Sequence, residues 1–300
     1  MAMGPDSFRT AANACIDIFE SFIKGRSNTA MKLSIVIPAH NEAGNIGTTI
    51  DALSHCLSRE SIDYEIVVVD DHSEDATCQE VEVHQAVNPR VRLVHNLNKN
   101  GFGYAVRCGL DHFAGDAVII FMADSSDDPE DVIKYYHILH DQAECAFGSR
   151  FIKGSLVVDY PPHKLILNRL ANLFIRTLFG LEYNDTTNAF KGYRSNVIRG
   201  CRPFLSPHFN LTVELPLKAI VRGYSYAIVP INWRNRAVGY SKLRIREMGS
   251  RYLFIVLYVL LEKWLTRGDY HRPHTEQFEP WSAETQAPAS IPSYQFDVPL

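Results

Sequence analysis

Short apolar runs alternate with amphipathic segments along the first half of the chain. The β-branched, apolar runs are typical of buried strands, which we expect at 32–38, 64–71, 91–95, 117–124 and 145–149. Between them, apolar residues recur at helical spacing, as at Ile46, Ile50, Leu53 and Leu57. This spacing predicts helices over 44–58, 74–86, 103–113 and 129–140. Strands and helices that alternate with short connections predict an α/β fold, in which helices cover both faces of a mostly parallel sheet.

The second half is predicted to be mainly helical. Residues 163–179 form a basic amphipathic pattern, and 208–223 form a second helical pattern in which Pro216 requires a helix start or a kink. Residues 226–233 are expected to form a strand, and Pro230 suits a sheet edge.

The chain divides into four predicted parts. They are an N-terminal arm over 1–30, an α/β domain over 31–245, a C-terminal helix over 246–270 and a disordered tail over 271–300. No apolar run reaches 18 residues, so no spanning helix is expected. The apolar core within 251–265 suits either a helix in the membrane interface or a core helix against the sheet.

Composition narrows the class of protein. The 46% hydrophobic content is ordinary for a soluble globular core. Residues 1–30 lack the apolar core of a signal peptide. The six cysteines form no CxxC pair, which argues against a cysteine metal cage and favours a cytoplasmic protein with reduced thiols.

Charge is distributed unevenly along the chain. Residues 1–149 hold 10 basic and 23 acidic residues, whereas 150–270 hold 19 basic and 7 acidic ones. The first part could host a cation, and the second could meet a phosphate, a nucleic acid or a membrane surface. Chance patterning of solvated faces is the alternative. A nucleic-acid partner is disfavoured because aromatic residues do not interleave with the basic ones.

Acidic residues follow the predicted strands, where open α/β sheets bind ligands. Asp70 and Asp71 end the second strand and suit the hydroxyl groups of a nucleotide, whereas Ser73 is explained as a helix cap. Asp124 ends the fourth strand in the same way.

A glycine-containing turn, NKNGFGYA, precedes the predicted helix 103–113. Its Lys99, Gly101 and Gly103 could approach a diphosphate. The third glycine of GxGxxG is absent, which disfavours a dinucleotide dehydrogenase.

The stretch FMADSSDDPED holds further acids with a different explanation. Asp128 precedes Pro129 and is the expected N-cap of the next helix, while Glu130 and Asp131 complement its dipole. Asp127 stays open between a structural and a chemical role.

Seven motifs resemble inverting family 2 glycosyltransferases of the GT-A (Rossmann-like) fold, closest to the dolichyl- or polyprenyl-phosphate mannose synthases. They are IVIPAHNEAGNI, EIVVVDDHSEDAT, NKNGFGYAVRCGL, FMADSSDDPED, GSRFIKG, NDTTNAFKGYR and PINWRNRAVGYSKLRI. The likeness covers about residues 32–245. It implies a nucleotide-sugar donor, with Pro38, Glu42, Asp70 and Asp71 lining the nucleotide pocket.

The resemblance also implies Mg²⁺ or Mn²⁺. The family's Asp-x-Asp motif falls on Met122-Ala123-Asp124, so its first acid is replaced, and its following polar residue is Ser126. Asp124, with Ser126 or Asp127, is therefore the expected metal site.

On the acceptor side, the resemblance places lipid phosphate at Arg150, Lys164, Asn168 and Arg236. Lys242 and Arg244 are expected to help, or are solvated surface charges. Two acids, Asp185 and Glu214, match recurring acids of the family and are expected to support the site or to bind sugar hydroxyls.

The resemblance implies transfer of a hexose from a nucleotide sugar to polyprenyl or dolichyl phosphate, with mannose from GDP-mannose the commonest case. Asp124, Arg150 and Arg236 are the expected catalytic residues, and a peripheral membrane location follows from the lipid. One alternative is transfer to a glycan or glycolipid hydroxyl, with Asp127 or Glu214 as base. The other is a non-catalytic nucleotide-sugar-binding protein.

Overall fold

The computed structural model describes residues 31–235, 245–272 and 279–281. Contacts group Met31–Pro280 into one compact unit, which is described below, and Met1–Ala30 with Trp281–Leu300 into another. The predicted N-terminal arm lies outside the described residues, as does most of the predicted tail over 271–300.

Seven strands form the central sheet in the order β3-β2-β1-β4-β7-β5-β8. Their bounds are β1 (Leu33–Ala39), β2 (Tyr64–Asp70), β3 (Val91–His95), β4 (Ala117–Ile120), β5 (Cys145–Ser149), β7 (Lys191–Arg194) and β8 (Tyr226–Pro230). Only β7 runs antiparallel to its neighbours β4 and β5, whereas the other pairs of this sheet are parallel. The predicted α/β architecture with a mostly parallel sheet is confirmed.

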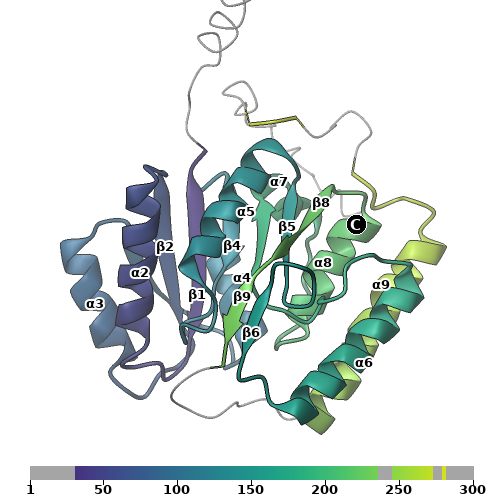
Figure 1. The fold of residues 1–300 in the computed structure, drawn as a ribbon, viewed down its shortest axis with the longest axis horizontal. Coiled ribbons are helices and arrows are strands. Elements are labelled where there is room, and N and C mark those ends of the chain that lie inside the picture. Colours follow the sequence, from purple (N-terminus) through teal and green to yellow (C-terminus); the bar gives the residue numbers. More distant parts are fainter. Residues whose placement is uncertain (1–30, 236–244, 273–278, 282–300) are drawn as a thin grey trace, which may run out of the picture. The chain divides into compact units, whose positions relative to one another are not determined.

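Helices cover both faces of this sheet (Figure 1). On one face lie α2 (Ile46–Arg59), α3 (Thr77–Val87) and α5 (Pro129–Asp141), and on the other lie α4 (Phe102–His112), α7 (Ser195–Gly200) and α8 (Leu211–Val221). Helices α6 (Pro162–Phe179) and α9 (Ile245–Leu265) pack with α8 around a separate apolar cluster. None of the described helices is long and apolar enough to cross a membrane.

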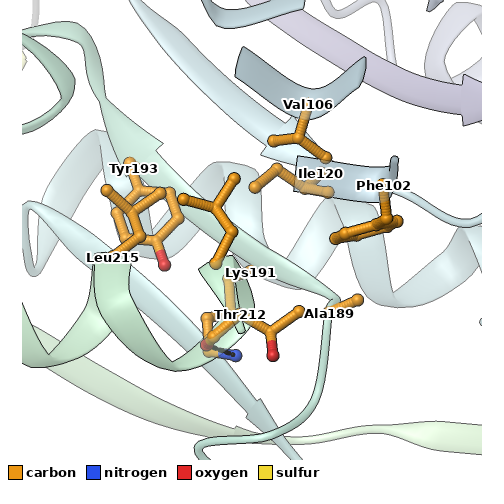
Figure 2. Close-up of a pocket in the computed structure, with 9 residues that line it drawn as sticks. Phe102, Val106, Ile120, Ala189, Lys191, Tyr193, Thr212 and Leu215 are labelled. Carbon is orange, nitrogen blue, oxygen red and sulfur yellow. Dashed lines mark hydrogen bonds between the residues drawn. The ribbon is translucent and has the colours of Figure 1, made fainter. Parts of the chain in front are cut away.

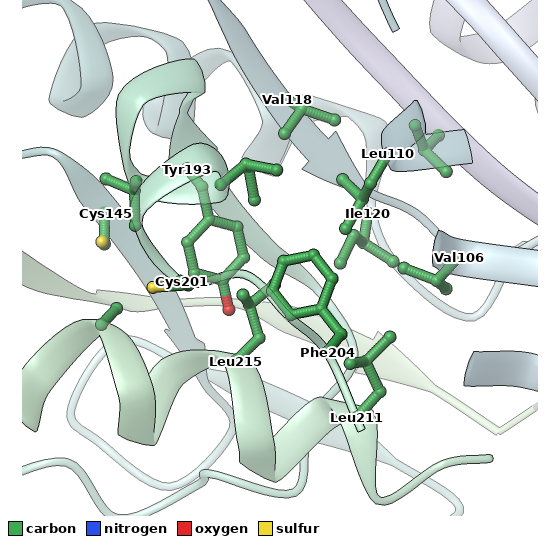
Figure 3. Packing of buried hydrophobic residues seen from close by; sticks show 14 of the residues in the cluster. Val106, Leu110, Val118, Ile120, Cys145, Tyr193, Cys201, Phe204, Leu211 and Leu215 are labelled. Atoms are coloured by element: carbon green, nitrogen blue, oxygen red, sulfur yellow. The ribbon is translucent and has the colours of Figure 1, made fainter. Parts of the chain in front are cut away.

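One apolar core lies between the sheet and helices α4, α7 and α8. Figure 3 shows Val118, Ile120 and Tyr193 of the sheet packed with Leu211 and Leu215 of α8. Every residue of β1 and β2 is buried because helices cover both sheet faces, which explains their continuous apolar runs.

The structure differs from the sequence prediction in several boundaries. β4 ends at Ile120, not at 124, and the predicted strand 226–233 divides into β8 and β9 (Asn232–Arg234). β9 pairs with β6 (Leu156–Val158), which the pattern missed together with β7 and α7. β8 is an edge strand, as Pro230 predicted.

The predicted start of the second helix, with Ser73 as its cap, is wrong. Helix α3 begins at Thr77, and its N-cap residue, Ala76, has no capping side chain. The hydroxyl of Ser73 instead accepts a hydrogen bond from the backbone N–H of Asn41, 3.1 Å away. Ser73 therefore ties the loop after β1 to the loop after β2.

Candidate active site

The carboxyl ends of the parallel strands form one edge that carries most of the predicted site residues. Asp70 ends β2 and lies opposite Ala39 of β1, and Ser149 ends β5 beside Arg150. Because β7 is antiparallel, its first residue, Lys191, lies at this same edge opposite Ile120. The topology thus brings acidic and basic side chains together from widely separated parts of the chain.

On the predicted donor side, Asp70 and Asp71 are both buried but differ in their contacts. Asp70 accepts a hydrogen bond from the Ser73 N–H at 3.0 Å. Burial raises the pKa of Asp70, but hydrogen bonds from Ser73 and His95 outweigh burial, so its pKa lies below the usual value and the carboxylate is ionised.

Asp71 holds the turn before α4. Its two carboxylate oxygens accept from the Asn96 side chain at 2.7 Å and from the Gly101 N–H at 2.8 Å. The Asp71 backbone carbonyl accepts from the Asn100 side chain. Asp71 therefore positions the glycine turn, and its predicted contact with a nucleotide stays a prediction.

The remaining predicted donor residues surround these two acids. Pro38 is buried in β1 opposite Val69. Glu42 follows β1, and its N–H donates to the Thr77 hydroxyl at 2.8 Å. Lys99 is exposed in the loop before α4.

Gly101 and Gly103 have a packing explanation within the fold. A Cβ atom at Gly103 would lie 2.5 Å from the Ser206 carbonyl oxygen, and one at Gly101 would lie 2.6 Å from that of Pro207. Glu214 in turn holds this segment, because its carboxylate accepts from the backbone N–H groups of Leu205 and Ser206. Glu214 thus supports the glycine turn from behind, and a diphosphate role for the two glycines stays a prediction.

We expect Gly103→Ala to lower the free energy of unfolding by about 1–3 kcal/mol, because the added methyl group meets backbone atoms that cannot rotate away. Chemical denaturation would measure this change. Gly249→Ala is the control, since a Cβ at Gly249 meets no atom within 4 Å. Equal stability of the two variants would contradict the packing role of Gly103.

The acids of FMADSSDDPED fall into two groups, as predicted: some begin helix α5, and others lie before it. Asp128 is the N-cap of α5, and its carboxylate accepts from the Glu130 N–H at 3.0 Å. Glu130 pairs with Arg59, and Asp131 pairs with Lys134. The structural role predicted for Asp128, Glu130 and Asp131 is confirmed.

Asp124 and Asp127 form a buried pair of acids beyond β4. Asp124 accepts from the Ser126 N–H at 3.2 Å. The Oδ2 atom of Asp127 is buried and has no hydrogen-bond partner among the residues that the structure describes. Burial, followed by repulsion from Asp124, raises the pKa of Asp127 to about 7. Two buried carboxylates that repel each other are suited to a divalent cation, which prefers oxygen ligands.

We expect Asp127→Asn to stabilise the metal-free protein above pH 7 by up to about 4 kcal/mol, since each pKa unit corresponds to about 1.4 kcal/mol. The folded-state pKa of Asp127, about 7, lies above its ordinary value of 3.8. Its stabilising contribution is therefore complete below pH 3.8 and is lost as the pH rises through 7. Thermal unfolding of both proteins between pH 4 and pH 8 would show a difference that grows with pH. A difference independent of pH would contradict the raised pKa.

Arg150 is buried in a pair with Asp185. Its Nε and Nη2 atoms both lie 2.8 Å from the Asp185 carboxylate, a bidentate arrangement. Its guanidinium also lies 5.4 Å from the ring centre of Tyr160 and 5.7 Å from that of Trp233. Burial lowers the pKa of Arg150, but attraction by Asp185 outweighs burial and raises it. Arg150 is thus a fixed positive charge at the carboxyl edge of the sheet. The role of Asp185 is to hold the Arg150 guanidinium in place.

Lys191 is a buried lysine for which the sequence predicted no role. Its Nζ donates to the backbone carbonyls of Thr186, Asn188 and Thr212. The Thr212 carbonyl is available because Pro216, which stands inside α8, has no N–H to donate to it. Burial lowers the pKa of Lys191 to about 7, although Asp185 acts in the opposite direction.

Figure 2 shows Lys191 beside Thr212 at a small apolar pocket lined also by Phe102, Val106 and Leu215. Its volume of about 10 Å³ is at most the space of one water molecule. This pocket is too small for a substrate.

The other predicted acceptor residues lie on α6 or outside the described residues. Lys164 is half-buried in the first turn of α6. Asn168 donates to the Thr187 hydroxyl at 2.7 Å and so connects α6 with the segment that leads to β7. Arg236, Lys242 and Arg244 lie outside the described residues.

The model of the family described as glycosyl transferase family 2 matches residues 34–201, which include both acid pairs, Arg150 and Lys191. The chain belongs to glycosyl transferase family 2. Family membership makes this protein a glycosyltransferase and does not favour the non-catalytic alternative.

Relatives of this family 2 glycosyltransferase include three named mannose transferases. A polyprenol monophosphomannose synthase of Mycolicibacterium smegmatis is 31% identical over 71% of this chain and 82% of its own length. A dolichol-phosphate mannosyltransferase of Pyrococcus furiosus is 29% identical over 71% of this chain and 60% of its own length. An undecaprenyl-phosphate mannosyltransferase of Micrococcus luteus is 25% identical over 78% and 96%. The predicted likeness to these synthases is confirmed.

Solved structures share the fold of this family 2 enzyme. Glucosyl-3-phosphoglycerate synthase from Mycobacterium tuberculosis, in complex with Mn²⁺, uridine diphosphate and glucosyl-3-phosphoglycerate, superposes with a TM-score of 0.58 at 20% identity. The match covers 78% of this chain and 80% of that chain. The same enzyme in complex with Mn²⁺, UDP-glucose and phosphoglyceric acid gives a TM-score of 0.58 at 20% identity. This match covers 78% of this chain and 79% of that chain. The predicted Rossmann-like GT-A fold is confirmed.

Proposed function

We propose that this family 2 enzyme transfers a hexose from a nucleotide sugar to the phosphate group of a polyprenyl or dolichyl phosphate. Mannose from GDP-mannose is the first donor to test, because three relatives are named as mannose transferases that use such lipids. The observation that carries the proposal is the pairing of buried acids with the fixed cation Arg150 at one edge of the sheet.

The donor would bind along the acidic part of this edge. The ionised Asp70 suits hydrogen bonds from nucleoside hydroxyl groups. Asp124 and Asp127 would hold Mg²⁺ or Mn²⁺, since the unpartnered Oδ2 of Asp127 offers an oxygen ligand. When bound, such a cation neutralises charge on the departing diphosphate. Met122 would leave that cation with one fewer carboxylate than the Asp-x-Asp motif provides.

The acceptor phosphate would meet the basic part of the edge. A phosphate oxygen attacks the anomeric carbon in line, and the bond from that carbon to the nucleoside diphosphate breaks. The phosphate is already anionic, so no side chain needs to remove a proton. Arg150 and Lys164 would attract and orient it, and Arg236 and Lys242 would help.

A membrane surface would bring the lipid to this edge. Helices α6 and α9 lie side by side in Figure 1 and share an apolar cluster. Their outer sides expose large apolar residues, which are Ile166, Leu167, Leu170, Leu173 and Phe174 on α6 and Leu253, Phe254, Leu257, Leu261, Trp264 and Leu265 on α9. The inner side of α9 packs against helices α6 and α8 in this cluster, not against the sheet. We propose that the outer sides insert into the headgroup region.

We expect replacement of Phe254 and Leu257 by serine to weaken binding to anionic liposomes at least about tenfold, because two exposed apolar side chains would no longer enter the bilayer. Flotation with purified liposomes measures this. Serine at Val83 and Val87, which are exposed on α3, is the matched control. A wild-type protein that does not float, with or without polyprenyl phosphate, would refute the membrane role.

Transfer to a sugar hydroxyl is a second candidate function, because one observation favours it. Such an acceptor needs a general base, and the pKa of Asp127, about 7, suits that role. Asp127→Asn should then abolish transfer to hydroxyl acceptors even at saturating Mn²⁺. Transfer to a phosphate needs no base, so it should lose only the metal affinity that Asp127 contributes and should recover at saturating Mn²⁺.

The deciding experiment is a matrix of nucleotide sugars against polyprenyl phosphate and hydroxyl acceptors, with and without Mn²⁺. The proposal predicts a mannosyl or other hexosyl lipid phosphate as the main product. Transfer to hydroxyl acceptors alone would overturn it in favour of the second function.

A further inference from the structure

Asp70, Cys78 and His95 form a mixed cluster beside the proposed donor site. Each offers one ligand atom, and these atoms all lie within 4.8 Å of one another. In the described part of the chain, this is the one group of three or more His, Cys, Asp or Glu side chains placed in this way. From this cluster we propose a site for Zn²⁺ that competes with the donor nucleotide.

The fold holds the three ligands on neighbouring elements. Asp70 and His95 are the last residues of the parallel strands β2 and β3 and face each other in register. Cys78 is the second residue of α3, the helix that connects these strands. The Ser73 N–H fixes the other oxygen of the Asp70 carboxylate. Sheet register thus sets the geometry of Asp70 and His95, and the first turn of α3 places Cys78 beside them.

The distance between two of the ligands suits a shared metal ion. His95 Nδ1 lies 3.3 Å from Asp70 Oδ2, longer than the usual 2.9 Å or so of a hydrogen bond. Two ligands bonded to one tetrahedral zinc at about 2.0–2.1 Å stand about 3.3 Å apart. The pair is therefore already spaced as two corners of a tetrahedron.

The ligand types distinguish this site from the Asp124 and Asp127 pair. A nitrogen, a sulfur and an oxygen are the ligands of zinc, whereas Mg²⁺ and Mn²⁺ prefer oxygen. The His95 side chain is 57% exposed, so the fourth position can be reached from solvent. One metal site would serve the reaction, and the other would respond to zinc.

Competition follows from Asp70, and this part rests on the proposed function. The same carboxylate cannot both ligate zinc and accept hydrogen bonds from a nucleoside in the proposed way. Zinc should therefore weaken binding of GDP or UDP without binding to Asp124 and Asp127.

Titration of the metal-stripped full chain with Co²⁺ alone tests the site without donor or turnover. We expect a thiolate-to-cobalt charge-transfer band that Zn²⁺ removes. Cys78→Ser should abolish the band, and His95→Gln should weaken Co²⁺ binding more than about tenfold. Cys56→Ser is the matched control, because its thiol, on α2, contacts the Pro129 carbonyl and lies outside the cluster. No band in the wild type, or a band that survives in Cys78→Ser, would overturn the site.

A second titration separates this inference from the proposed function. Binding of GDP and of UDP is measured by calorimetry with and without Zn²⁺. We expect zinc to lower the affinity for whichever nucleotide binds by at least about tenfold. Zinc bound at the cluster with unchanged nucleotide affinity would leave the metal site standing but refute the competition and the donor role of Asp70.

Discussion

Asp124→Asn is expected to lower the turnover of this glycosyltransferase by about 10²–10³-fold, the usual effect of removing one group that stabilises developing charge. The amide keeps the shape of the side chain and can still accept from the Ser126 N–H. It removes the negative charge that, with Asp127, would hold a divalent cation against the donor diphosphate. Initial rates at saturating donor and Mn²⁺ measure the change.

The neighbouring acid Asp128 provides the control. Asp128→Asn alters charge four residues further along the chain, and asparagine is an equally good N-cap for α5. Its rate should stay near that of the wild type. Near-normal turnover of Asp124→Asn would show that the chemistry does not depend on this acid. Repulsion between Asp124 and Asp127 also disappears in Asp124→Asn, so a lower melting temperature is not expected.

Arg150→Met is expected to lower the free energy of unfolding by about 3–5 kcal/mol, because it leaves the fully buried Asp185 carboxylate without its partner. Urea denaturation measures this loss. Adding Asp185→Asn should restore part of the stability, because the double variant no longer buries an unpaired charge. The asparagine side chain can still accept a hydrogen bond from the backbone N–H of residue 150.

Arg169→Met is the matched control for the arginine side chain. Arg169 is exposed and lies over the ring of Phe151 at 4.6 Å, so it shares the aromatic contact but not the buried ion pair. Its loss should cost less than about 1 kcal/mol. Equal costs for Arg150→Met and Arg169→Met would show that the pair with Asp185 adds nothing to stability.

The sequence predicts the fold best where burial is continuous. β1, β2 and their helices follow from apolar runs because both faces of these strands are covered. β7 was missed because its four residues, KGYR, include a buried lysine and a buried arginine and give no apolar signal. β6 and β9 have three residues each, too few for any periodicity.

In the candidate site, too, roles set by sequence neighbours could be predicted, whereas roles set by distant contacts could not. Asp128 could be assigned from its neighbour Pro129 alone, because capping is a local property. Asp127 could not, since its raised pKa depends on burial and on the charge of Asp124, and it forms a β-bridge with the distant Trp233. Lys191 lies within a motif of the family, but its three carbonyl partners became visible only in the fold.

The lysine at the start of β7 also affects how parts of the molecule can open. Lys191 connects the 186–188 segment to α8 through a carbonyl that Pro216 leaves available. Separation of either segment from the sheet would deprive the buried Lys191 side chain of hydrogen-bond partners. The 186–188 segment and the first half of α8 should therefore unfold and refold as one cooperative unit, while the loop that carries Lys99 remains free to move separately.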